Sequence, residues 1–155
     1  MLAVFPEALH LKIMMVVIDA CVAIKFITSE LGTDEANLLL ASENDLVAPE
    51  LMLIETAHGL WKKVAADEIR QADAVDGLAK LPQFFEPFVP AAELLPDAQA
   101  LSFLLAHGVY DCLYLALAIR EQVQLVTADR KFWNAARRAK LDAHVQLFTW
   151  PGQGT

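Results

Sequence analysis

Four acidic residues stand beside apolar runs that are typical of buried elements: Asp19, Glu55, Asp111 and Asp129. Asp19 follows the run MMVVI and Asp129 closes LVTAD, whereas Glu55 lies in PELMLIE and Asp111 in VYDCLYLALA. A carboxylate in such a place is expected at the C-terminal rim of a parallel sheet, which is where open α/β folds bind ligands. If all four converge there, they form a metal site.

Carboxylates gathered in one cavity repel each other. Two of them about 5 Å apart, at an effective dielectric constant of about 20, repel by roughly 3 kcal/mol. Either some of them are protonated, or a divalent cation neutralises them. Oxygen ligands favour a hard ion, Mg²⁺ or Mn²⁺, over zinc, and no CxxC or HxxxH spacing supports a zinc site.

Three of the acids also have a purely structural explanation. Asp19, Asp111 and Asp129 each directly precede a predicted helix, where an aspartate N-cap contributes roughly 1 kcal/mol. Glu55 lies too far inside its helix, which begins near Pro49, to be a cap. Caps alone do not explain why the acids gather at one edge of the sheet, and helix N-termini at that edge also favour phosphate.

Several neighbours of the acids are candidates for supporting roles. Thr127 is a candidate to orient Asp129 or to contact a substrate phosphate, and its structural alternative is an ST-turn at the strand end. Cys21, two residues after Asp19, is expected to be a small buried hydrophobe. Basic residues cluster after the last acid, and Arg130, Lys131 and Arg137 are candidates for binding substrate, although a solvated helix face explains them equally well.

Other conspicuous side chains are expected to be structural. His58 and His107 have no partner in the sequence pattern and are predicted to lie near helix surfaces or ends. The three tryptophans are predicted to belong to the core or to an interface rather than to stack on bases: Trp61, Trp133 and Trp150.

Composition predicts one folded domain. The 155 residues are 56% hydrophobic and 21% charged, which argues against disorder, and a chain of this length buries a substantial core. The net charge of -8 excludes a globally basic nucleic-acid binder, so any nucleic acid must be held locally. Two cysteines cannot form a disulfide framework, and the apolar run before Asp19 is too short to span a bilayer; we expect a cytoplasmic protein with no membrane partner.

Short apolar runs alternate with helical patterns along the chain, which predicts an α/β fold with a central parallel sheet between helices. Residues 14–150 are predicted to form the single domain, 1–13 a disordered extension and 151–155 a tail. The expected strands are 14–18, 46–48, 84–90, 124–127 and 145–149, and the expected helices are 23–27, 49–66, 67–81, 95–107, 111–120 and 130–140. A further helix is expected within 32–44, with Thr33 as its cap.

Four segments in this order resemble the PIN-domain family, and within it the VapC-like toxin ribonucleases: VVIDACVAIKF, PELMLIETAHGLWK, VYDCLYLALA and LVTADRKF, within residues 15 to 133. The resemblance implies a three-layer α/β/α sandwich and a Mg²⁺- or Mn²⁺-dependent endoribonuclease with Asp19, Glu55, Asp111 and Asp129 as its catalytic and metal-binding residues. It also implies a homodimer and a small antitoxin protein whose C-terminal segment covers the acidic groove. Cys21 stands where the family commonly has Ser, and a thiol is a weaker hydrogen-bond partner than a hydroxyl.

The reaction expected from the resemblance is hydrolysis of an RNA phosphodiester by metal-activated water. Asp19 and Asp111 are predicted as direct metal ligands, and Glu55 and Asp129 are predicted to bind a second ion or position water. Three alternatives stay open: an RNA-processing nuclease without an antitoxin, an inactive PIN-like module that binds a partner, and a phosphotransfer domain. Cys21 disfavours the last, because a haloacid-dehalogenase-like site needs an aspartate there.

Overall fold

The computed structural model describes residues 14–153, in which five parallel strands form a sheet of order β3-β2-β1-β4-β5. The strands are β1 (Met15–Ile18), β2 (Asp45–Pro49), β3 (Phe88–Val89), β4 (Gln124–Thr127) and β5 (Val145–Leu147). Helices cover both faces of this sheet, so the predicted three-layer α/β/α fold is confirmed. The predicted extension 1–13 and the last two residues of the predicted tail lie outside the described residues.

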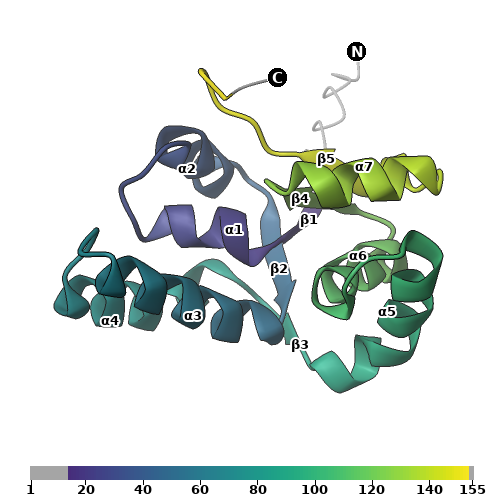
Figure 1. Cartoon of the computed structure of the whole chain (residues 1–155), viewed down its shortest axis with the longest axis horizontal. Coiled ribbons are helices and arrows are strands. Elements are labelled where there is room, and N and C mark those ends of the chain that lie inside the picture. The colour runs from purple at the N-terminus through teal and green to yellow at the C-terminus, as the bar shows by residue number, and fades with distance from the viewer. Residues whose placement is uncertain (1–13, 154–155) are drawn as a thin grey trace, which may run out of the picture.

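Helices α1 to α4 lie to the left of the strands in Figure 1, and α5 to α7 lie to the right. Their bounds are α1 (Ala20–Ala23), α2 (Thr33–Ala41), α3 (Leu51–Ala65), α4 (Gln71–Lys80), α5 (Ala91–Leu105), α6 (Val109–Glu121) and α7 (Arg130–Arg138). Short 3₁₀ turns follow three of the elements, at η1 (Ile24–Phe26), η2 (Leu81–Phe84) and η3 (Asp142–His144).

The chain reverses its direction across the sheet after β3. From β1 it steps outward to β2 and β3, and α5 and α6 then carry it back to β4 on the other side of β1. Because parallel crossovers are right-handed, this reversal places α5 to α7 on the opposite face from α1 to α4. It also leaves the C-terminal ends of β1 and β4 side by side, with Ile18 opposite Val126, which is the switch point where open α/β sheets bind ligands.

Helix α6 forms the centre of one face of the core. Residues 112–118 are all buried, and the helix contacts β1, β2 and β4. This confirms the expectation of a helix that is apolar nearly all round, because such a helix must be covered on every side. No single helix within residues 14–153 is long and apolar enough to cross a membrane, and only the pair α5 and α6, bent by 114°, reaches that length and hydropathy together.

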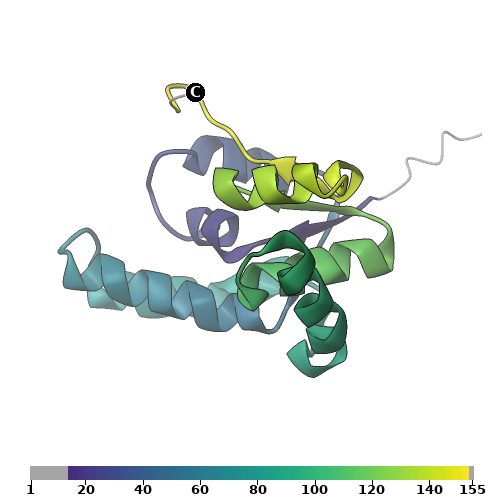
Figure 2. The ribbon, with the colours of Figure 1, turned by 45° about the vertical axis from the view of Figure 1, so that its right-hand side comes forward.

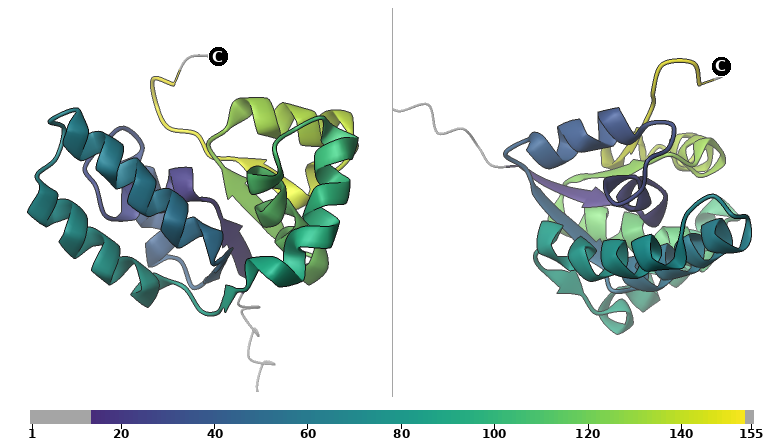
Figure 3. Two further views of the ribbon diagram at one scale, coloured as in Figure 1. Left: turned by 60° about the horizontal axis from the view of Figure 1, so that its bottom comes forward. Right: turned by 90° about the vertical axis from the view of Figure 1, so that its left-hand side faces the viewer.

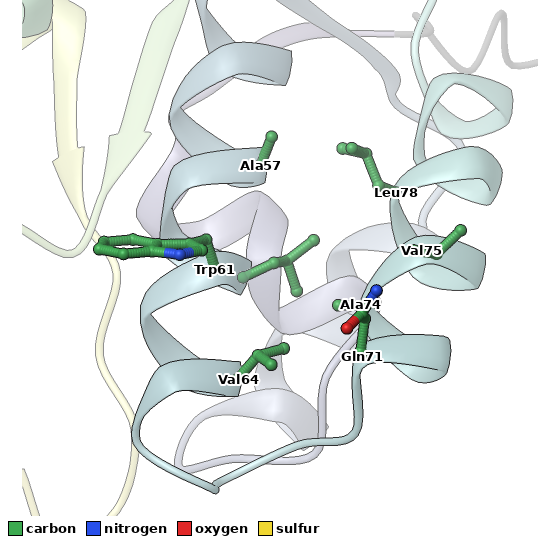
Figure 4. A pocket seen from close by; sticks show the side chains of 8 residues that line it. Ala57, Trp61, Val64, Gln71, Ala74, Val75 and Leu78 are labelled. Carbon is green, nitrogen blue, oxygen red and sulfur yellow. The ribbon is translucent and has the colours of Figure 1, made fainter.

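Helices α3 and α4 form an antiparallel pair that extends beside the sheet (Figures 2 and 3). Across an apolar groove, Ala57 of α3 faces Leu78 of α4, and Val64 faces the turn of α4 that carries Gln71 and Ala74 (Figure 4). Trp61 on α3 is 62% exposed and stacks on His58. This tryptophan was predicted to lie in the core or at an interface, and the core placement is wrong. Trp133 and Trp150 are partly buried against the core, as predicted.

The element boundaries differ most from prediction around the prolines. Residues 84–90 were expected to form a strand, but only Phe88–Val89 pair with β2, because Pro87 and Pro90 cannot donate to a ladder. Helix α5 begins at Ala91, four residues before its predicted start, and continues through Pro96. The edge strand β3, on the other side of the sheet from β5, therefore has only two residues, and the site at β1 and β4 is unaffected.

Leu117 offers a test of the core assignment. It is fully buried in α6, so Leu117→Ala should lower the free energy of unfolding by about 2 to 5 kcal/mol through lost burial and the cavity left behind. Urea denaturation followed by circular dichroism measures this change. The matched control is Leu38→Ala on α2, where the side chain is 71% exposed and the expected change is within about 0.5 kcal/mol; equal losses in both variants would contradict the placement of α6.

Candidate metal centre

Asp19 leaves the C-terminal end of β1 and is the N-cap of α1, as predicted. Its Oδ1 atom accepts a hydrogen bond from the Val22 backbone N–H at 3.1 Å and another from the Cys21 thiol at 2.7 Å. The residue is only 7% exposed. Burial raises the pKa of the Asp19 carboxyl from 3.8 to about 6, against the lowering effect of its hydrogen bonds, and the charge of Asp111 raises it further.

Cys21 and Thr127 join the ends of β1 and β4. The Cys21 sulfur accepts a hydrogen bond from the Ala128 N–H at 3.3 Å and lies 4.0 Å from the Thr127 hydroxyl, which in turn accepts from the Asp129 N–H at 3.1 Å. Cys21 as a residue is exposed, contrary to the prediction of a buried hydrophobe, but its sulfur faces these inner groups. Desolvation of the sulfur and the charge of Asp19 raise the pKa of the thiol, so it stays protonated and donates.

Asp129 is the N-cap of α7, also as predicted. Its Oδ1 atom accepts from the Phe132 N–H at 3.0 Å, which fixes the carboxylate at the start of that helix. The Thr127 hydroxyl bonded to the Asp129 N–H matches the ST-turn explanation of Thr127. Both acids at the strand ends are therefore held by their own helices, on opposite sides of the switch point.

Asp111 is not an N-cap, and this prediction is wrong. The cap of α6 is Gly108, whose extended backbone starts the helix at Val109, so Asp111 lies within the first turn. His107 does have a partner, contrary to expectation: its Nε2 atom lies 2.6 Å from Asp111 Oδ2. The two residues are four apart in the sequence. They come into contact because of the turn between α5 and α6, which the sequence pattern did not predict.

Glu55 reaches the same edge from α3 and is held by a residue that sequence reasoning missed. The Tyr114 hydroxyl donates to Glu55 Oε1 at 2.6 Å, and Tyr114 is 1% exposed. Burial and the charge of Glu55 raise the pKa of Tyr114, so it remains a donor. Burial and the charge of Asp111 also raise the pKa of Glu55. Tyr114 follows Asp111 by three residues, one helical turn, and this spacing is the signal that could have revealed it.

The structure brings Asp111 and Asp129 together with His107, whereas Asp19 and Glu55 lie outside that close group but within the electrostatic reach of Asp111. Asp111 is close enough for its charge to raise the pKa of both Asp19 and Glu55, and one ligand atom each from His107, Asp111 and Asp129 lies within 4.8 Å of the others. Like charges in such proximity destabilise each other unless protons or a cation intervene. The donor set of carboxylate oxygens with one imidazole fits a divalent ion.

The basic residues predicted to bind substrate divide into two places. Arg130 and Lys131 are exposed in the first turn of α7, next to Asp129. Arg137 lies about 10 Å further along that helix, and its guanidinium group packs over the Trp133 ring at 4.4 Å from the ring centroid. A cleft of about 590 Å³ also opens beside Glu55 and Cys21, and it is lined by Lys62 and Tyr110.

Comparison with known proteins gives consistent matches. A sequence model of the PIN domain matches residues 16–138. Ribonuclease VapC3 of Pyrobaculum aerophilum is 33% identical over 122 residues, covering 76% of this chain and 92% of that protein. Ribonuclease VapC1 of Mycobacterium tuberculosis is 34% identical over 94 residues, covering 59% of this chain and 68% of that one.

Two solved structures share the fold. The crystal structure of PAE2754 from Pyrobaculum aerophilum superposes with a TM-score of 0.61 at 20% identity, covering 80% of this chain and 86% of that chain. A chain in the structure of VapBC2 from Rickettsia felis, bound to a promoter DNA fragment, gives a TM-score of 0.60 at 17% identity, covering 88% of this chain and all of that chain. Because the PIN model covers most of the sequence and VapC3 is related over nearly its full length, the chain belongs to the PIN domain family.

Proposed function

We propose that this protein is a metal-dependent endoribonuclease and the toxin of a toxin–antitoxin pair. The observation that carries the proposal is the proximity of Asp111 and Asp129 beside the switch point of the sheet, with Asp19 and Glu55 near enough for the charge of Asp111 to raise the pKa of each. Relatives named ribonuclease VapC, one of them matched over 92% of its length, support the reaction class. The family also disfavours the phosphotransfer alternative, which requires an aspartate at the position of Cys21.

In this proposal Asp19, Asp111 and Asp129 hold a divalent ion, and Glu55 completes the site by binding a second ion or a water molecule. A bound Mg²⁺ or Mn²⁺ would supply an activated water and neutralise charge on the phosphoryl oxygens. The Tyr114 hydroxyl fixes the orientation of Glu55. No side chain is required as a nucleophile.

RNA is proposed to enter along the cleft beside Glu55, with its phosphates held by local positive charge. Lys62 lines this cleft, and Arg130 and Lys131 project from the N-terminal turn of α7, whose backbone N–H groups also attract anions. Arg137 remains a candidate contact further along the helix. Local basic groups resolve the conflict between an RNA substrate and a net charge of -8.

Protein partners are proposed from the apolar surface. Ile54, Trp61 and Val75 on α3 and α4 are each more than 60% exposed, and they suit an antitoxin that covers this side and the acidic groove. Phe103 and Leu104 on α5 are exposed as well, which supports a homodimer. A solved structure that shares the fold is named VapBC2, bound to a DNA fragment from their promoter, and this supports the proposal of an antitoxin partner.

Replacement of Asp111 tests the catalytic role. Asp111→Asn keeps the size of the side chain but removes a charged ligand, so Mn²⁺-dependent cleavage of tRNA and ribosomal RNA should fall by more than about a hundredfold, since changes to groups outside a metal's own ligands already cost about 10- to 100-fold. The matched control, Asp97→Asn on the exposed side of α5, should cleave normally, and EDTA should abolish cleavage by both active forms. Undiminished cleavage by Asp111→Asn would favour a different site, and no cleavage by wild type would favour the inactive binding module.

Asp19 gives a test of the metal site that needs no RNA. Because its folded pKa is raised from 3.8 to about 6, the metal-free folded state holds more protons than the unfolded state in that window, and stability is lost as pH rises through it. Asp19→Asn avoids this loss, so its advantage over wild type in urea unfolding with EDTA should grow by about 2 to 3 kcal/mol between about pH 4 and pH 7. Adding Mn²⁺ at neutral pH should stabilise wild type more than the variant. A constant difference across pH would contradict the buried position of Asp19.

Arg130 tests the proposed phosphate contact. Arg130→Gln should weaken the binding of RNAs of different sequence by the same factor. It should also reduce the slope of log affinity against log salt concentration by about 0.7 to 1, because one phosphate is no longer neutralised. Filter binding in EDTA, where the RNA stays intact, measures both quantities. The control is Arg120→Gln, which should leave the slope unchanged; Arg120 lies in the last turn of α6 and pairs with Glu93 and Glu121. Equal effects of the two substitutions would mean that positive charge in general, and not the position of Arg130, holds RNA.

A further inference from the structure

The residue that the four-acid pattern leaves out is His107. Its Nε2 atom is 2.6 Å from Asp111 Oδ2, and it belongs with Asp111 and Asp129 to the group whose ligand atoms lie within 4.8 Å of one another. Two atoms that bind one ion at about 2.1 Å lie about 3 Å apart at right angles and about 4.2 Å apart when opposite. The three atoms are thus spaced so that small side-chain rotations bring all of them onto one ion.

The backbone of His107 is fixed by the end of α5. Ala106 adopts the left-handed conformation with φ 48°. The His107 N–H donates to the Ser102 carbonyl at 3.1 Å, and the Ala106 N–H donates to the Phe103 carbonyl at 3.4 Å. This is the pattern of a Schellman motif. The Ser102 hydroxyl donates to the His107 carbonyl, so both backbone groups of His107 are occupied.

The imidazole ring is fixed as well. It packs against Phe132 of α7 with 4.8 Å between ring centroids and 46° between planes, and the side chain is only 13% exposed. Phe132 is itself buried, and its backbone N–H donates to the carboxylate of Asp129, the N-cap of α7. One aromatic residue therefore positions both the histidine ring and the helix start that carries Asp129, which is how a ligand set is preorganised rather than how a surface histidine is placed.

We propose that His107 is a nitrogen ligand of the metal held by Asp111 and Asp129, and that it makes this site select Mn²⁺ over Mg²⁺. The inference rests on the proposed function, in that it takes the two aspartates as ligands. Mg²⁺ prefers an all-oxygen shell and keeps several waters, whereas an imidazole nitrogen suits first-row transition ions. A site with three carboxylates alone would not discriminate in this way.

The competing role for His107 is that of an outer partner, which hydrogen-bonds Asp111 and never touches the ion. Such a partner orients its carboxylate for any metal, so its loss weakens Mg²⁺ and Mn²⁺ alike. A glutamine at position 107 retains a donor for Asp111 and would rescue an outer role. A nitrogen ligand, by contrast, couples magnetically to bound Mn²⁺, and glutamine does not replace it.

The experiment uses the full chain without an affinity tag and Mn²⁺ alone as the probe. Pulsed electron paramagnetic resonance should show ¹⁴N coupling to the bound ion in wild type and in the control His58→Gln, whose ring is exposed on α3, and the coupling should vanish in His107→Gln. The same variant should lose at least about tenfold in Mn²⁺ affinity while Mg²⁺ affinity, measured by competition, changes less than about threefold.

A second measurement needs no substitution and so does not depend on the variant folding. Wild-type protein grown with ¹⁵N-labelled histidine should replace the ¹⁴N modulation by that of ¹⁵N. Mn²⁺ binding that requires Asp111 but shows no nitrogen coupling, or an equal loss of both ions in His107→Gln, would overturn the role of His107 and leave the proposed nuclease intact. Mn²⁺ binding that survives Asp111→Asn would overturn the metal site itself, and with it both proposals.

Discussion

The constraint on which the structure depends is the reversal of the chain between β3 and β4. It forces two strand ends, β1 and β4, to open side by side at one edge of a parallel sheet, with helices departing to opposite faces. Asp19, the first residue after β1, and Asp129, the second residue after β4, cap these helices, so local helix stability and the convergence of charge have the same cause. The repulsion that results is relieved by protonation, for which the raised pKa of Asp19 provides, or by a bound cation.

Helix α6 turns this edge into a site. It is buried through residues 112–118, and it carries Asp111 toward the edge and Tyr114 toward Glu55 on the opposite side of the cavity. The acid on α3 is therefore linked to α6 by the part-buried hydrogen bond from Tyr114. The thiol of Cys21 performs a comparable task between β1 and β4, donating to Asp19 while accepting from Ala128.

The fold class and the strand ends near Asp19 and Asp129 could be predicted from the sequence, because short apolar runs that stop shortly before an Asp mark strand ends. The catalytic and metal-binding roles of the four acids stay a prediction. The details that failed depend on the chain's path between elements. The extended backbone at Gly108 moves the start of α6 and makes Asp111 an interior residue, and the left-handed Ala106 brings His107 onto it. Tyr114 was hidden within an apolar helix, where its hydroxyl gives no periodic signal. The strand predicted over residues 84–90 is shorter in the structure because two prolines interrupt its pairing with β2.

The attachment of Asp111 and Tyr114 to the least accessible helix has a consequence for how such a scaffold diversifies. Substitutions that would reshape the reacting centre pass through α6 and therefore endanger the whole domain, so they are rarely open to selection. Glu55 ties one side of α3 to Tyr114 of that helix, whereas Ile54, Trp61 and Val75 on α3 and α4 are exposed and are therefore freer to change. New targets and new inhibitors are expected to be acquired at this periphery while the chemistry stays the same.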